Sequence, residues 1–171
     1  MVGCAGGPGA ADEDAGATGV AAPAPAVCEV PVEQVWPVRH VVMWPDKTLD
    51  FIKVPGDESE NARHFGIYAS SDGGSGRLAS VVSLFSEEGG ASAQFRKFAT
   101  LPEFQRRGLG TALLCHVIGE ARAQGAQRLW CNARIEQADF YAKFGLRQTG
   151  ESFTREGKDY AIMELRLTPD M

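Results

Sequence analysis

The stretch FRKFATLPEFQRRGLGTALLCHVIGEARAQG, residues 95–125, decides how this chain folds. Residues 95–100 are predicted to form a strand, and Pro102 marks a turn after it. A helix is predicted next, because apolar side chains recur on one stripe at i, i+4 and i+8. These side chains are Leu109, Leu113 and Val117. The stretch therefore predicts a strand, a turn and an amphipathic helix in direct succession.

The start of that helix is rich in glycine and arginine. Gly108 and Gly110 lie where the helix begins, and Arg106 and Arg107 precede them. A helix N-terminus leaves backbone N–H groups unpaired and carries partial positive charge. Glycine allows a phosphate to approach that backbone closely. The local chemistry predicts a bound anion, in particular a pyrophosphate, although a plain packing turn is the alternative.

Two familiar phosphate motifs do not fit this turn. A Walker phosphate loop needs Gly-Lys-Ser/Thr, which is absent, and the dinucleotide fingerprint needs a third glycine where this chain has Leu113. The pattern that fits is Gln/Arg-x-x-Gly-x-Gly/Ala.

A second informative stretch is RLWCNARIEQADFYAKFGL, residues 128–146. Residues 128–132 indicate a buried strand that ends at Asn132. Phe-Tyr-x-Lys follows at residues 140–143, with Tyr141 as its second aromatic residue, and Gly145-Leu146 comes shortly after.

Taken together, the two stretches resemble the signatures of the GNAT superfamily of N-acetyltransferases. The resemblance covers roughly residues 63–167, and Leu146 departs from it, since phenylalanine is commoner there. It implies an α/β (α+β) GNAT fold, with a mixed, mostly antiparallel central sheet flanked by helices. It also implies that acetyl-CoA is the co-substrate. The residues that the resemblance assigns to its binding are Phe98, Ala99, Thr100, Gln105, Arg106, Arg107, Gly108, Leu109, Gly110, Thr111 and Asn132.

The implied reaction is direct transfer of an acetyl group to a primary amine of a small molecule or peptide, within a ternary complex. Tyr141 occupies the family's general-acid position and is the expected catalytic residue. The base is open, because residues 92–100 contain no carboxylate. Glu103, Glu136 and His40 are alternatives, as are a water chain or an acceptor amine of low pKa. A catalytically silent GNAT-fold module that binds acyl-CoA is therefore the second hypothesis.

Charge separates the chain into two parts. Residues 1–38 carry five acidic side chains and no lysine or arginine, whereas residues 39–171 carry 17 basic and 17 acidic ones. Residues 1–28 are rich in Ala, Gly and Pro and are expected to form a disordered acidic tail, and residues 29–171 to form the acetyltransferase-like domain. The neutral domain disfavours nucleic acid as a partner, and short apolar runs disfavour a membrane span.

Cysteine and histidine show no metal pattern. Cysteines at positions 4, 28, 115 and 131 form no Cys-x-x-Cys pair, which favours reduced thiols and a cytoplasmic or nucleocytoplasmic location. A catalytic thiol at Cys131 stays open as an alternative. The histidines at positions 40, 64 and 116 lack metal-ligand spacing, so no metal is expected.

The remaining segments complete the expected sheet. Residues 32–43 are predicted to be helical, broken or kinked at Pro37 and ended by Pro45. A loop over residues 70–76 is predicted to connect two of the strands. The strands are expected at residues 64–69, 77–86, 92–100, 145–151 and 160–167.

Overall fold

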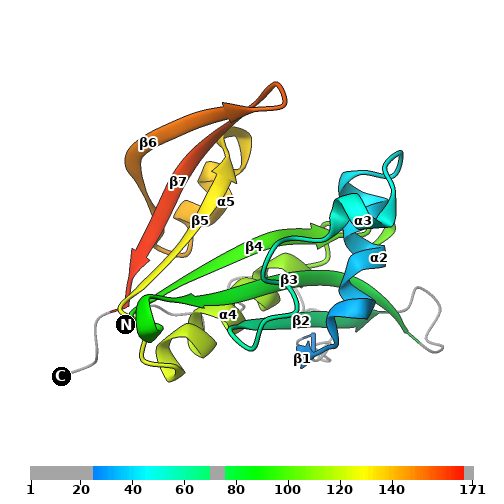
Figure 1. The fold of residues 1–171 in the computed structure, drawn as a ribbon, viewed down its shortest axis with the longest axis horizontal. Coiled ribbons are helices and arrows are strands. Elements are labelled where there is room, and N and C mark those ends of the chain that lie inside the picture. Colours follow the sequence, from blue (N-terminus) through cyan, green and yellow to red (C-terminus); the bar gives the residue numbers. More distant parts are fainter. Residues whose placement is uncertain (1–24, 70–75, 168–171) are drawn as a thin grey trace, which may run out of the picture.

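The computed structural model describes residues 25–69 and 76–167, and within these ranges the chain forms one sheet of seven strands. The strand order is β1-β2-β3-β4-β5-β7-β6 (Figure 1). Most of the expected acidic tail, and most of the loop at 70–76, lie outside the described residues. The strands are β1 (Cys28–Glu29), β2 (Ala62–Ala69), β3 (Arg77–Glu87), β4 (Ser92–Thr100), β5 (Arg128–Arg134), β6 (Arg147–Arg155) and β7 (Lys158–Arg166).

Neighbouring strands run antiparallel except for β4 and β5, which are parallel. This confirms the predicted mixed, mostly antiparallel sheet. A parallel pair needs a crossover, and α4 provides it. The α-helices are α2 (Val32–Met43), α3 (Leu49–Ile52), α4 (Leu109–Ala123) and α5 (Ala138–Ala142). Short 3₁₀ turns lie at η1 (Glu88–Gly90), η2 (Pro102–Phe104) and η3 (Ile135–Gln137).

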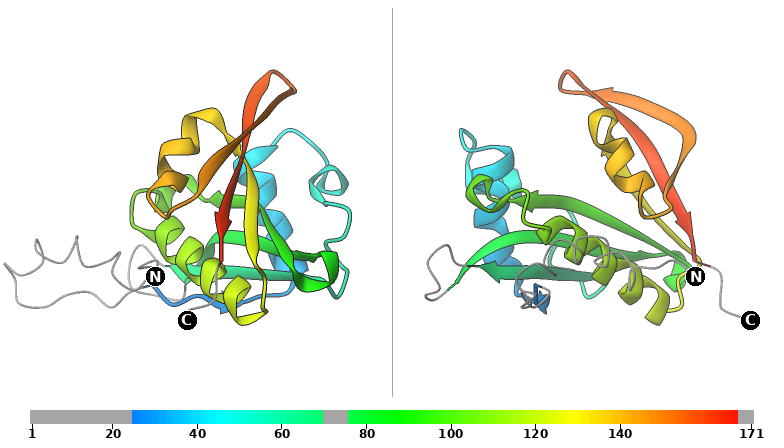
Figure 2. Two further views of the ribbon diagram at one scale, coloured as in Figure 1. Left: turned by 90° about the vertical axis from the view of Figure 1, so that its left-hand side faces the viewer. Right: turned by 180° about the vertical axis from the view of Figure 1, so that it is seen from behind.

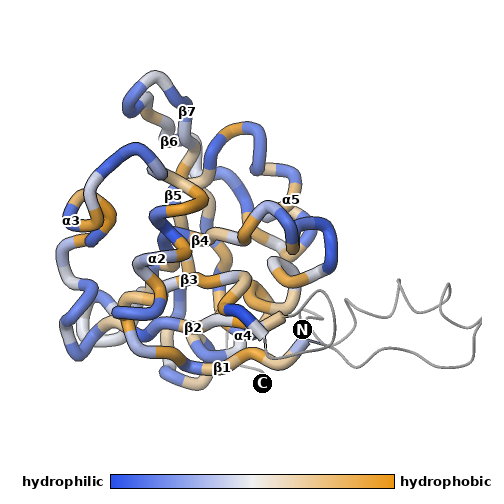
Figure 3. Tube along the Cα trace, turned by 90° about the vertical axis from the view of Figure 1, so that its right-hand side faces the viewer, coloured by the Kyte–Doolittle hydropathy of each residue, from blue (hydrophilic) through white to orange (hydrophobic). Residues whose placement is uncertain are grey.

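Helices α2 and α4 cover opposite faces of the sheet (Figures 1 and 2). The stripe predicted for α4 is its buried face, which comprises Leu109, Leu113, Leu114, Val117, Ile118 and Ala121. The helix ends as expected, because Gly125 takes a left-handed φ of 86° and the N–H of Ala126 bonds back to the carbonyl of Ala121 at 3.0 Å. Apolar residues gather inside, whereas the turn joining β6 to β7 is hydrophilic (Figure 3).

Helix α2 has the predicted bounds, but Pro37 does not break it. Proline removes one helical hydrogen bond, and burial of the residues on either side stabilises the helix against that loss. The buried side chains are Val35, Trp36, Val38 and Arg39.

Two short elements, β1 and α3, were not predicted. Strand β1 pairs Cys28 with Gly66 and Glu29 with Phe65. Paired structure therefore begins at Cys28, one residue before the domain boundary expected from composition. No helix within the described residues is long and apolar enough to cross a membrane.

The feature that positions the site is the separation of β4 from β5. Only Ser92–Gln94 pairs with Arg128–Trp130; beyond these residues the two strands diverge (Figure 1). On its other side β4 is bulged, since its register with β3 shifts between Val81 and Ser83. Lys97 lies in the bulge with φ of 57°, a left-handed conformation that is unusual for a residue with a side chain.

Candidate active site

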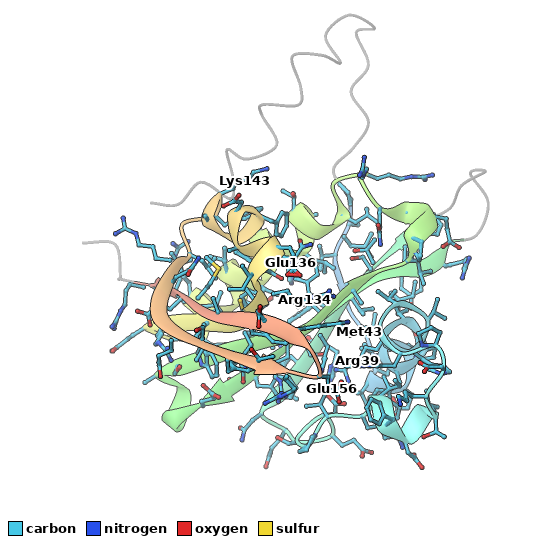
Figure 4. All side chains as sticks on the ribbon, turned by 90° about the horizontal axis from the view of Figure 1, so that it is seen from above. Arg39, Met43, Arg134, Glu136, Lys143 and Glu156 are labelled. Atoms are coloured by element: carbon cyan, nitrogen blue, oxygen red, sulfur yellow. The ribbon has the colours of Figure 1, made fainter. Side chains whose placement is uncertain are left out.

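A cleft of about 730 Å³ opens where β4 and β5 separate, which is within the usual size of a small-molecule site. Its lining comes from both halves of the sheet, from the C-terminal end of α2 and from the start of α4. Figure 4 shows three labelled residues from its borders: Met43 from α2, Arg134 from β5 and Glu156 from the turn between β6 and β7.

One end of the cleft is the N-terminus of α4. Gly108 is the N-cap residue, with φ of 79° and no side-chain capping bond, so the first amides of the helix have no side-chain acceptor. Arg106 is also left-handed, with φ of 64°. The side-chain amide of Gln105 donates to the carbonyl of Thr100 at 3.1 Å, which ties this turn to the end of β4. The arrangement suits an anion.

The two glycines of this turn have different roles. At position 108 the left-handed backbone is what favours glycine, because a Cβ there would meet nothing within 4 Å. Gly110 has an ordinary helical backbone, and a Cβ would lie 3.5 Å from the ring of Phe98 and 3.7 Å from that of Phe140. Gly110 therefore leaves room in the cleft against two aromatic rings.

Strand β4 forms the floor of the cleft. After Gln94 its β5-facing edge has no strand partner among the described residues, so its N–H and C=O groups are available to an extended ligand. Phe98, Ala99 and Thr100 line the cleft along this edge.

Tyr141 is held in the cleft wall by aromatic packing. Its ring lies 5.7 Å from Phe95 and 5.3 Å from Phe140, centroid to centroid, and Phe140 in turn packs edge-on against Phe98 at 6.4 Å. Burial raises the pKa of the Tyr141 phenol above its ordinary value, with the nearby Cys131 adding to the shift. The phenol is therefore protonated at neutral pH. Lys143, from the same motif, lies away from the cleft (Figure 4).

Asn132 lies within β5, which extends to Arg134, and not after the strand as the sequence suggested. It pairs with Ile162 of β7 and is exposed to the cleft. The cap positions of η3 and α5 are Arg134 and Gln137, so Asn132 does not cap the following helix.

Eleven of the twelve predicted site residues line this one cleft. Arg107 is not part of the lining. Its guanidinium lies 5.2 Å from the ring of Phe104. The lining residues are Phe98, Ala99, Thr100, Gln105, Arg106, Gly108, Leu109, Gly110, Thr111, Asn132 and Tyr141.

The three residues considered as alternative bases lie outside the lining. Glu103 pairs with Arg77 at 2.8 Å, Glu136 is exposed, and His40 donates through Nε2 to the carbonyl of Lys47 at 2.7 Å. Among the described residues, the one carboxylate in the lining is Glu156.

Sequence reasoning missed Glu156 and its neighbours. Glu156 and Gly157 form a two-residue turn with φ of 51° and 75°, the geometry that suits a tight hairpin, and this turn brings Lys158 and Tyr160 to the cleft. The Glu-Gly pair between two strand-like runs was the available signal. On the other wall, Val42, Met43 and Trp44 were missed because nothing local shows that α2 ends at the cleft.

Cys131 lines the cleft but is buried, and burial raises the pKa of its thiol to about 12. The thiol is therefore neutral at physiological pH and a poor nucleophile. Over residues 25–69 and 76–167, no group of three or more His, Cys, Asp or Glu side chains is arranged to hold a metal.

A buried polar network fixes α2 beside the cleft. Arg39 is fully buried and forms two bonds to the carboxylate of Asp57, at 2.7 and 3.0 Å. It also donates to the hydroxyl of Ser83 on β3 at 2.8 Å. The indole of Trp36 and the N–H of Val54 donate to the same carboxylate. The network therefore joins α2, the segment after α3 and the sheet.

Comparison with known proteins agrees with this geometry. The family model described as Acetyltransferase (GNAT) domain matches residues 57–167. The uncharacterized N-acetyltransferase YitI of Bacillus subtilis (strain 168) is 28% identical over 133 residues, which covers 75% of this chain and 86% of that relative.

Solved structures share the fold. An aminoglycoside 6'-N-acetyltransferase in complex with coenzyme A superposes with a TM-score of 0.67 at 12% identity, covering 85% of this chain and 99% of that one. A GNAT family acetyltransferase of Elizabethkingia anophelis with acetyl-CoA bound gives a TM-score of 0.58 at 16% identity, with 83% and 97% covered. With the family model spanning most of the sheet, the cleft and α4, this chain belongs to the GNAT acetyltransferase family.

Proposed function

We propose that this protein is an acetyl-CoA-dependent N-acetyltransferase that moves an acetyl group directly to a primary amine within a ternary complex. The observation that carries the proposal is the split between β4 and β5, which joins an anion-binding helix N-terminus, an unpaired strand edge and Tyr141 in one cleft.

The α4 end of the cleft suits the pyrophosphate of coenzyme A. The start of α4, with its backbone amides, and Arg106 line this end. The free edge of β4 at Phe98, Ala99 and Thr100 suits the amide groups of an extended pantetheine arm, which would add to the sheet as a further strand does. Acetyl-CoA supplies an activated acetyl thioester to this site.

Two groups of the chain suit the chemistry of the thioester. A backbone N–H of β4 between Phe98 and Thr100 would donate to the carbonyl oxygen as negative charge develops there. The protonated phenol of Tyr141 would give its proton to the leaving thiolate. The acceptor would enter from the α2 side, since α4 covers the other face of the sheet.

The second candidate is a silent acyl-CoA-binding module. The observation in its favour is that β4 carries no carboxylate, so the cleft lacks a base on the strand beside the thioester.

Release of thiol from acetyl-CoA across a panel of amines separates the two. Turnover is expected with some acceptors. The Tyr141→Phe variant should lose at least about tenfold in kcat, since general acid catalysis typically contributes about 10²–10⁴-fold. CoA affinity should be unchanged, because the ring packing is kept.

Tyr68→Phe is the matched control, since Tyr68 is exposed on β2 and outside the cleft lining. Tight CoA binding without thiol release for any amine would favour the silent module. A kcat of Tyr141→Phe within about twofold of the parent would remove Tyr141 from the mechanism.

A further inference from the structure

The acceptor side of the cleft carries an unusual excess of positive charge. Arg96 and Lys97 from β4 and Lys158 from β7 line it, and we refer to these three as the cationic cluster. Arg155, beside the turn of the same hairpin, adds a further positive charge that acts on both Arg96 and Lys97. The opposite sign is represented in the lining, within the described residues, by Glu156 alone.

Two other cations near the cleft have ion-pair partners. Arg39, which is deeper, has its charge balanced by Asp57 at 2.7 Å, and Arg134 has Glu136 at 3.8 Å. No member of the cationic cluster forms an ion pair with a carboxylate in residues 25–69 and 76–167. Arg96 and Lys97 are partly removed from water without an ion-pair partner, and Lys158 adds an exposed positive charge beside them, so the cluster is set to receive an anion.

Lys97 has an unusual backbone and a side chain held against α2. Its backbone is left-handed at the bulge, a conformation that is disfavoured for a residue with a side chain. Its ammonium lies 4.5 Å from the ring of Trp44 at the end of α2, a cation–π contact that orients the side chain but does not balance its charge. Backbone strain of this kind concentrates at binding and catalytic sites.

Electrostatics agrees with the geometry. Burial together with neighbouring cations lowers the pKa of Lys97 to about 8, and the one nearby carboxylate opposes this only in part. Burial likewise lowers the pKa of Arg96. An anion placed between the two would relieve both effects.

We propose that the cationic cluster is a subsite for an anionic group, a carboxylate or a phosphate, carried by the acceptor amine. The inference rests on the proposed acetyltransferase function and narrows its substrate class. Amino acids and aminoalkyl phosphates fit such a site, with the ammonium toward Glu156. Polyamines, which carry only positive charge, do not fit it.

Matched pairs of acceptors test the subsite. Each L-amino acid is compared with its α-carboxamide, and phosphoethanolamine with ethanolamine, by thiol release from acetyl-CoA. The amine beside a carboxamide has a lower pKa than the amine beside a carboxylate, so more of it is deprotonated. Without a subsite, the amide should therefore be the faster acceptor. We expect kcat/KM to favour the anionic member of at least one pair by about tenfold or more, as charge-assisted hydrogen bonds give.

Variants assign that preference to Lys97. Lys97→Met should lower kcat/KM for the anionic acceptor by about tenfold to a hundredfold while changing that of its neutral partner by less than about twofold. Lys97→Glu should reverse the order and favour diamines. Lys53→Met is the matched control, because Lys53 lies over Trp36 at the same 4.5 Å but outside the cleft lining.

A binding measurement does not depend on turnover. Calorimetry on CoA-saturated protein compares an N-acetyl amino acid with its N-acetyl carboxamide, and tighter binding of the acid, lost in Lys97→Met, is expected. Equal binding, or equal losses of turnover with both members of a pair, would overturn the subsite.

The parent could instead prefer succinyl-CoA over acetyl-CoA, lose that preference in Lys97→Met, and show equal kcat/KM for the anionic and neutral acceptors. That result would assign the cluster to the acyl donor and overturn the proposal. Absence of turnover with every acceptor contradicts the proposed function instead, and the binding comparison then decides the subsite by itself.

Discussion

The buried pair of Arg39 and Asp57 offers the sharpest test of how α2 is held beside the cleft. Both side chains are almost fully buried, at 0% and 2% exposure, and the carboxylate of Asp57 accepts four hydrogen bonds. Asp57→Asn keeps the shape but leaves the guanidinium of Arg39 buried without a counter-charge. Breaking a buried pair from one side costs about 3–5 kcal/mol.

That loss is large against a total stability of about 5–15 kcal/mol. For a domain of this size it corresponds to a fall in Tm of about 10–20 °C. Thermal unfolding followed by far-UV circular dichroism measures it. Asp46→Asn, at an exposed position, should leave Tm unchanged and serves as the control.

Dependence on pH gives an independent check. Burial raises the pKa of Asp57, but bonds from Arg39, Trp36 and Val54 outweigh it, so the net pKa lies below the ordinary 3.8. A lowered carboxylate pKa contributes stability above the unfolded value and loses it as pH falls through the folded value. The difference in Tm between parent and Asp57→Asn should therefore shrink below pH 3.8.

A fall in Tm of less than about 3 °C at neutral pH would refute this account of the network. Arg39→Met combined with Asp57→Asn should lose less than the sum of the two single changes, because the isolated charge is then gone.

Three further perturbations address the cofactor side of the cleft. Gly110→Asp should abolish CoA binding in calorimetry without lowering Tm, because a carboxylate stabilises a helix N-terminus yet repels a pyrophosphate; unchanged affinity would contradict the anion site. Asn132→Asp should weaken CoA binding several-fold, since Asn132 faces the cleft and caps no helix; an affinity within twofold would show that it only lines the wall. Cys131→Ala should keep kcat within about twofold, as expected for a protonated buried thiol, and a larger loss would restore a catalytic role for it.

Local signals predicted much of this molecule. The strand, turn and helix over residues 95–125, and the bounds of α2 at Val32–Met43, follow from periodicity and from glycine and proline placement. Two linked motifs indicated most of the cofactor side of the cleft, because those residues are continuous in the chain.

The acceptor side was not predictable in the same way. Its walls come from α2 and from the β6–β7 turn, which are far apart in the sequence and meet only through the sheet. The bulge at Lys97 depends on its pairing with β3, and the Arg39–Asp57 pair spans α2 and the segment after α3. Sequence periodicity does not predict contacts between segments that lie so far apart in the chain.

The short contact between β4 and β5 also divides the molecule mechanically. Among the described strands, only three residue pairs join the unit of β1 to β4 with the unit of β5, β7 and β6, and aromatic contacts from α5 to Phe95 and Phe98 add to them. A ligand lying in the split would bridge the two units, so their local opening should become one cooperative event when it binds. Amide hydrogen exchange would show this as slower exchange along the free edge of β4 and, at a distance, in the β6–β7 hairpin. The short strand contact would then set not only where a ligand lies but also how stiff the whole sheet is.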